Sequence, residues 1–203
     1  MVLADLSVMW ITTRAAGVVA LVASTASVVL GLALAGRVGA RRKRGLLGDV
    51  RVLHQTLGVA TLVALAVHAG TLLLDPWLKP SLVDLLVPFS LDYRPLWTGL
   101  GIIAGYGLVV LGLSGFLRGR KGTRWAAIHR FAGLTWVLSI GHTLGAGTDA
   151  GATWLTALTT ACVVPVAGCS PCASAAPRRA FRNNPRLKAL VRDSDHTTRA
   201  PRR

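Results

Sequence analysis

The apolar residues of this chain are gathered into blocks, most of them long enough to cross a lipid bilayer. The blocks cover residues 9–35, 53–74, 96–117, 125–144 and, more briefly, 152–168. A hydrocarbon core needs about 20 apolar residues of α-helix, and the first four blocks reach that length. Lipid offers the backbone no hydrogen-bond partners, so such blocks predict helices. We therefore expect an all-α fold, a polytopic membrane helical bundle of about five transmembrane helices.

The position of the charges predicts an orientation. The chain carries a net charge of +15, and its Lys and Arg residues gather in 37–51, in 118–124 and after Pro177. In a five-span topology these segments all lie on one side of the membrane. The other side holds mainly acidic residues: Asp5, Asp75, Asp84, Asp92 and Asp149, against Lys79 and Arg94. The positive-inside rule then places the N-terminus outside and the C-terminus in the cytoplasm.

The same distribution indicates the partners and the compartment. Basic loops without a folded domain of their own do not make a nucleic-acid interface, so we expect membrane lipid and no nucleic acid as a partner. The first block lacks a basic leading region and is longer than a signal peptide, so it is predicted to be a true span. The expected location is the plasma (inner) membrane, as a multi-pass protein.

Two regions are expected along the chain. Residues 1–168 form the membrane domain, and residues 169–203 form a basic cytoplasmic tail that we expect to be disordered or to lie on the membrane surface. Cys162, Cys169 and Cys172 lie at the boundary. A cytoplasmic position disfavours a disulfide, and no second Cys/His pair completes a zinc site, so no function is assigned to them.

Four histidines form two matched pairs inside the apolar blocks. His54 and His68 lie fourteen residues apart in one block, and His129 and His142 lie thirteen apart in another. At the α-helical rise, each pair spans about 20 Å along its helix. The charge asymmetry puts His54 and His129 on the cytoplasmic side, and His68 and His142 on the outer side.

The chemistry available to these histidines is narrow. The blocks contain no Asp or Glu, and the chain has no Glu at all, which disfavours a proton or ion relay. Histidines about 20 Å apart on one helix cannot share a zinc or copper ion. A haem iron needs one imidazole from each of two helices. The pattern predicts two b-type haems, one held by His54 and His129 and the other by His68 and His142.

The unequal spacing of the two pairs has a geometric consequence, and Arg14, Arg130 and Trp136 are three further residues of interest. Fourteen residues nearly complete four helical turns, whereas thirteen do not, so the fourth helix must be distorted or tilted, or the two haems are laterally offset. Arg14 at the outer level and Arg130 at the inner level are candidate partners of haem propionates. Trp136 lies between His129 and His142, where a packing role is the simpler interpretation and an electron stepping point is the alternative.

These features together resemble the ferric reductase-like transmembrane domain, which ferric reductases and NADPH oxidases share. The resemblance covers about residues 10–164 and includes the histidine spacings, which in that family belong to haem ligands. Four further stretches are similar to those of short bacterial members: Thr13-Arg14-Ala15-Ala16-Gly17, Val87-Pro88-Phe89, Tyr93-Arg94-Pro95-Leu96-Trp97 and 142–149.

The resemblance implies a membrane subunit of an oxidoreductase that transfers electrons across the membrane to an external acceptor such as ferric iron. Oxidases of that family continue into a flavin and nicotinamide domain, and no glycine-rich dinucleotide motif follows the last block here. We therefore expect a separate flavin reductase or quinol as the donor, with flavin only through that partner. The alternative hypothesis is a non-catalytic membrane scaffold or metal-binding membrane protein.

Overall fold

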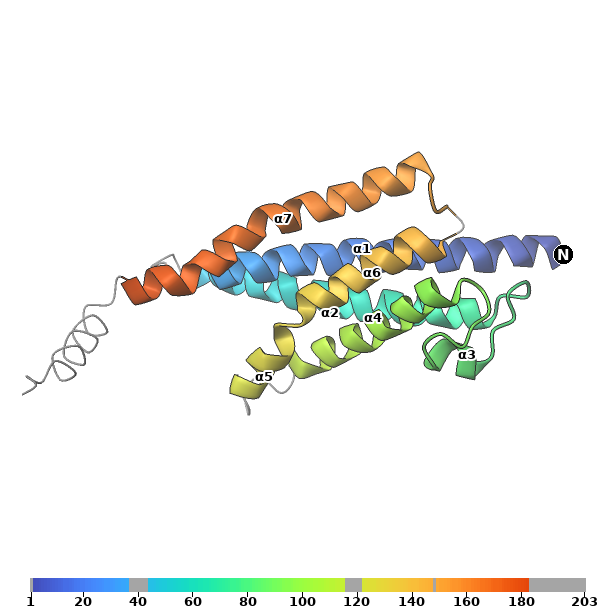
Figure 1. The fold of residues 1–203 in the computed structure, drawn as a ribbon, viewed down its shortest axis with the longest axis horizontal. Helices are drawn as coiled ribbons and strands as arrows, with labels where there is room; N and C mark the ends of the chain where they lie inside the picture. Colours follow the sequence, from blue (N-terminus) through green and yellow to red (C-terminus); the bar gives the residue numbers. More distant parts are fainter. Residues whose placement is uncertain (1, 37–43, 116–121, 148, 183–203) are drawn as a thin grey trace, which may run out of the picture.

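In the computed structural model, the part of the chain that is described consists of helices and loops, without strands (Figure 1). The structure describes residues 2–36, 44–115, 122–147 and 149–182, and the basic segments of the orientation argument lie largely outside them. The helices are α1 Val2–Gly36, α2 Arg44–Leu73, α3 Leu82–Leu86, α4 Pro95–Ser114, α5 Gly122–His129, α6 Ala132–Ala146 and α7 Thr153–Arg182. The prediction of an all-α helical bundle is confirmed.

The long helices form two closely packed pairs. α1 lies along α2 with extensive contact, and α4 lies along α6 (Figure 1). The contacts of α1 with α6 and of α2 with α4 are much sparser, and α7 packs on the other side of α1. The two histidine-bearing segments therefore belong to different pairs, α2 to one and α5–α6 to the other.

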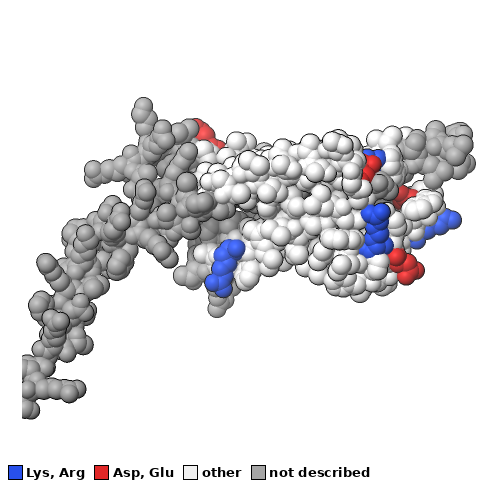
Figure 2. Space-filling model, turned by 45° about the horizontal axis from the view of Figure 1, so that its top comes forward, with Lys and Arg blue, Asp and Glu red and all other residues white. Residues whose placement is uncertain are grey.

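Three helices within the described part are long and apolar enough to cross a membrane: Val8–Ala35, Gly48–Leu73 and Pro95–Ser114. α6 has 15 residues, and Thr153–Cys169 is a shorter apolar helix. Many large apolar side chains are exposed; Val59, Val63 and Val110, for example, are each more than half exposed. On the face drawn in Figure 2, charged side chains lie toward the two ends and the middle belt carries none. Such a belt is compatible with burial in lipid.

Small residues line the helix contacts. Buried positions include Ala16, Ala23 and Ala104, and the largest buried side chain of the core cluster is Trp136, packed with Leu21 and Cys162. Small residues let helix backbones approach closely where no hydrophobic effect drives them together. Trp136 donates its indole N–H to Thr25 Oγ1 at 2.9 Å, which joins α6 to α1.

The fourth predicted span is broken. α5 ends at His129, and α6 begins at Ala132. Between them the Phe131 amide donates to the Ile128 carbonyl at 3.1 Å, a tighter turn than an α-helix makes, and Phe131 has ψ −1°. The prediction of a single helix over 125–144 is wrong in this detail. The expected distortion is present, and the break lies between the two histidines that are thirteen residues apart.

The last helix is longer than expected. α7 continues through residues 169–182, so the backbone is helical in the first part of the segment expected to be disordered or to lie on the membrane surface. The stretch contains Ala173, Ala175 and Ala176, and alanine is the best helix former. Residues 183–203, which include the rest of the predicted tail, lie outside the described residues.

The loop between α2 and α4 is folded onto α4. Its short helix α3 starts with a capping box, in which Ser81 and Asp84 exchange side-chain and backbone hydrogen bonds. The Tyr106 hydroxyl donates to the Leu86 carbonyl, which supplies the partner that Tyr106 needs in an apolar setting. Trp77 and Tyr93 make an edge contact at the same end, with ring centroids 6.1 Å apart.

Candidate functional site

The four histidine side chains meet as two pairs, in the combination predicted from the sequence. The ring centroids of His54 and His129 are 5.9 Å apart, and those of His68 and His142 are 6.2 Å apart. The two rings of each pair stand nearly perpendicular, at 82° and 86°. Each pair joins a residue of α2 to a residue of α5 or α6, so it bridges the two halves of the bundle.

Backbone carbonyls determine which ring nitrogen carries hydrogen in three of these four residues. Nδ1 of His54 lies 2.8 Å from the Ser27 carbonyl oxygen, Nδ1 of His68 lies 2.8 Å from that of Thr13, and Nδ1 of His142 lies 2.9 Å from that of Trp97. A carbonyl oxygen only accepts, so Nδ1 is the protonated nitrogen of the neutral ring. Nε2 then keeps its lone pair, which is the usual state of a histidine that binds a metal.

His129 is held differently from the other three. It is the last residue of α5 and stacks on Trp125 of the same helix, with centroids 4.9 Å apart and planes at 19°. The helix break follows it directly. Because the break changes the direction of the chain, His129 and His142 both reach α2 although thirteen residues do not complete a whole number of turns.

Helix α1 provides a matching surface for the histidines of α2, which the sequence reasoning missed. A Cβ placed on Gly17 would lie 3.1 Å from the His68 ring, and one on Gly31 would lie 3.3 Å from the His54 ring. Gly17 and Gly31 are fourteen residues apart, as are Thr13 and Ser27, whose carbonyls accept from the same histidines. The repeated pattern of a hydroxyl residue and a glycine four positions later was the available signal.

The arrangement fits an iron ion held between two imidazoles. An imidazole nitrogen binds a transition metal at about 2.0 Å and lies about 1.1 Å from its ring centroid, so a linear centre separates two centroids by about 6 Å. Both observed separations match that distance. Within the described part of the chain, no group of three or more His, Cys, Asp or Glu side chains is placed to hold a metal. The two imidazoles at each level are a donor pair that could hold a haem iron.

The two candidate propionate partners have different surroundings. Arg14 forms an ion pair with Asp149 and lies over the Trp10 ring, 4.1 Å from its centroid. Its charge thus already has a carboxylate partner within the protein, and its contact with a propionate stays a prediction. Arg130 is exposed, lies 5.3 Å from the Phe131 ring centroid and lines a cavity of about 370 Å³ beside the helix break.

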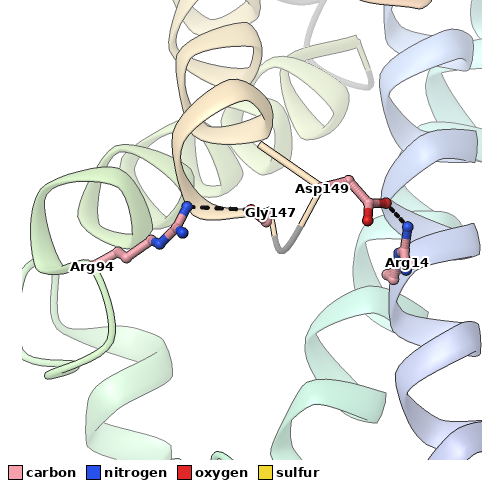
Figure 3. Close-up of polar contacts among 4 residues, drawn as sticks. All are labelled: Arg14, Arg94, Gly147 and Asp149. Atoms are coloured by element: carbon pink, nitrogen blue, oxygen red, sulfur yellow. Dashed lines mark hydrogen bonds and ion pairs between the residues drawn. The ribbon is translucent and has the colours of Figure 1, made fainter. Parts of the chain in front are cut away.

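Two arginines hold the connection between α6 and α7 (Figure 3). Arg94, at the start of α4, donates to the carbonyls of Gly145 at 2.6 Å and Gly147 at 3.3 Å. Arg14 reaches the same connection from α1 through Asp149. The loop after His142 is in this way tied to both halves of the bundle.

Trp136 and the three cysteines are the remaining residues considered in the sequence. Trp136 is buried against α1 by its hydrogen bond to Thr25, which agrees with the packing interpretation. Cys162 is buried and Cys169 is partly buried, and both are free thiols. Cys172 has no described side chain.

Comparisons of the chain with protein-family models, with curated proteins and with solved structures find no significant match. The geometry of the histidine pairs is therefore the basis for inferring the function of this chain.

Proposed function

We propose that this protein is a membrane cytochrome b that carries electrons across the lipid bilayer through two haems, each bound by two histidines. The observation that carries the proposal is the pairing of imidazole rings across the two halves of the bundle, at 5.9 and 6.2 Å, with Nδ1 anchored to backbone carbonyls. A haem held by these histidines would supply a one-electron ferric/ferrous couple.

The protein orients the histidine rings and sets their electrostatic surroundings. The carbonyls of Ser27, Thr13 and Trp97 orient three of the rings and make them more basic, because each accepts the hydrogen opposite the metal-binding nitrogen. Gly17, Gly31 and Gly101 leave room for the rings beside neighbouring helices. Exclusion of water by the apolar helices keeps both levels in a medium of low dielectric constant.

The proposed direction of transfer runs from the cytoplasm outward. The positive-inside rule assigns His54 and His129 to the inner level and His68 and His142 to the outer level of the plasma membrane. Electrons enter from a separate flavin reductase or from quinol, and leave to an external acceptor such as ferric iron. The resemblance to ferric reductases supports this acceptor.

Spectroscopy of the purified protein tests the proposal. Reduced-minus-oxidised spectra are expected to contain low-spin haem b bands, and a pyridine haemochrome assay is expected to give two haems per chain. His68→Ala should remove one haem and leave the other, whereas His196→Ala, a change of the fifth histidine outside the blocks, should leave both. Purification from haem-replete cells without any bound haem would refute the function, and full haem retention in His68→Ala would refute the ligand assignment.

A further inference from the structure

Two hydroxyl side chains of α1 occupy equivalent positions but contact different partners. Thr13 and Ser27 are fourteen residues apart, and the carbonyl of each accepts from one histidine of α2. The Ser27 hydroxyl oxygen also lies 3.0 Å from Nδ1 of His54. The Thr13 hydroxyl instead donates to Thr71 Oγ1 at 2.8 Å. The inner histidine of α2 thus has one more polar neighbour than the outer one at the same nitrogen.

The hydrogen-bond directions at Ser27 follow from its partners. The Ser27 carbonyl requires the hydrogen to be on Nδ1 of His54, so the nearby hydroxyl oxygen accepts a share of the same N–H. The hydroxyl hydrogen is then free to point to the main-chain carbonyl of His54, 3.4 Å away. Ser27 consequently holds both the ring and the backbone of His54.

At the outer level the hydroxyls connect only the helices. Thr71, which accepts from Thr13, donates its own hydrogen to the main-chain carbonyl of Val67 at 2.7 Å or of His68 at 3.2 Å. Neither of these hydroxyl contacts involves the His68 ring. A change of the Thr13 hydroxyl therefore perturbs the α1–α2 contact and leaves the carbonyl contact to the ring in place.

An additional acceptor at Nδ1 changes the metal-binding nitrogen. It increases the electron density of the imidazole and makes Nε2 a stronger donor. A stronger donor stabilises ferric iron more than ferrous iron, so it lowers the reduction potential. Hydrogen bonding around the ligands is one of the factors that set this potential. We propose that Ser27 is a positioning residue whose hydroxyl lowers the reduction potential of the inner haem site relative to the outer one. This inference rests on the proposed function, and a lower potential at the inner site favours outward electron transfer.

The test measures the two midpoint potentials by spectroelectrochemical titration, together with the low-spin ferric g values. Ser27→Ala is expected to shift the midpoint of the inner haem to a more positive value and to leave the outer one unchanged. Ser27→Cys, which keeps a side chain of similar size but a weaker acceptor, should give a smaller shift in the same direction. Ser27→Thr retains the hydroxyl and should retain the wild-type midpoint. Thr13→Val is the matched control and should move neither midpoint.

The inner haem is identified in a His68→Ala background, where it is the one that remains. Unchanged midpoints in both Ser27→Ala and Ser27→Cys would overturn the inference, and so would an equal shift in Thr13→Val. In each of those outcomes the wild-type protein still binds two haems, so the proposed function survives. A wild-type protein that binds no haem would instead reject the proposed function and this inference together.

Discussion

Replacing Gly101 by alanine tests the haem site proposed for His68 and His142 with the addition of one methyl group. A Cβ on Gly101 would lie 2.7 Å from Cγ of His142 and nearer still to its Nδ1, whereas ordinary contact begins at 3.4 Å. His142 is also the residue whose Nδ1 is anchored to the Trp97 carbonyl at 2.9 Å. The substitution therefore pushes directly against an oriented ring.

The size of the effect follows from these distances. The ring must recede by about 1 Å to restore normal van der Waals separation, while metal–ligand distances tolerate about 0.2 Å. The move also breaks the hydrogen bond to Trp97, which costs about 1 kcal/mol, and overpacking adds about 1–3 kcal/mol. Such a displacement is too large for His142 to keep an axial position.

The assay is the haem content of the purified variant, with a control on the same helix. Gly101→Ala is expected to lower the stoichiometry from two haems to one. In Gly105→Ala the new Cβ would lie 3.8 Å from a methyl group of Leu65, an ordinary contact, so both haems should remain. Alanine favours a helix over glycine by about 1 kcal/mol, so weakening of α4 cannot explain a loss. Two haems and an unchanged outer-haem spectrum in Gly101→Ala would refute the reasoning.

Three further predictions concern stability outside the histidine pairs. Arg94→Ala removes the donor to the carbonyls at the end of α6, and faster limited proteolysis of the α6–α7 connection is expected; an unchanged cleavage rate would contradict this role. Trp136→Phe removes the hydrogen bond to Thr25 and should lower the free energy of unfolding by about 1 kcal/mol, measured by thermal or denaturant unfolding in detergent. Hydrogen bonds from Ser81 lower the pKa of Asp84 below its ordinary value of 3.8. The stabilisation of α3 by its capping box is therefore complete above pH 3.8, and it is lost as the pH falls through the lower pKa that Asp84 has in the folded protein. Amide exchange in α3, corrected for its intrinsic pH dependence, should accelerate in that acidic range, and Ser81→Ala should move the onset to higher pH.

The fold class was predictable because apolar length is a local property of the sequence. The blocks at 9–35, 53–74 and 96–117 agree with α1, α2 and α4 to within several residues at most ends. The break at Arg130 and Phe131 was not located in advance, because a two-residue change in backbone geometry leaves the apolar pattern continuous. The extension of α7 to Arg182 was missed because its polar composition resembles that of a tail.

The pairing of the histidines was predictable from the sequence, but the partners of other polar side chains were not. His54, His68, His129 and His142 stand out as ionisable residues in apolar blocks, and their pairing follows because the two histidine-bearing segments run in the same direction. The partners of Arg14 and Tyr106, by contrast, are Asp149 and the Leu86 carbonyl, which come from distant loops. Such contacts depend on how loops fold onto helices, which composition does not specify.

The sequence by itself determined the helical, membrane-compatible character of the chain and the spacing of the four histidines in its apolar blocks, since both follow from the fixed rise and turn of an α-helix. Only the tertiary structure decided that α1 supplies the carbonyls and glycines opposite His54 and His68, and that Ser27 and Thr13 direct their hydroxyls differently. The physical reason is that apolar residues are spread all around α1, so its hydrophobic pattern does not mark the face that meets α2. That face is chosen by close packing between helices.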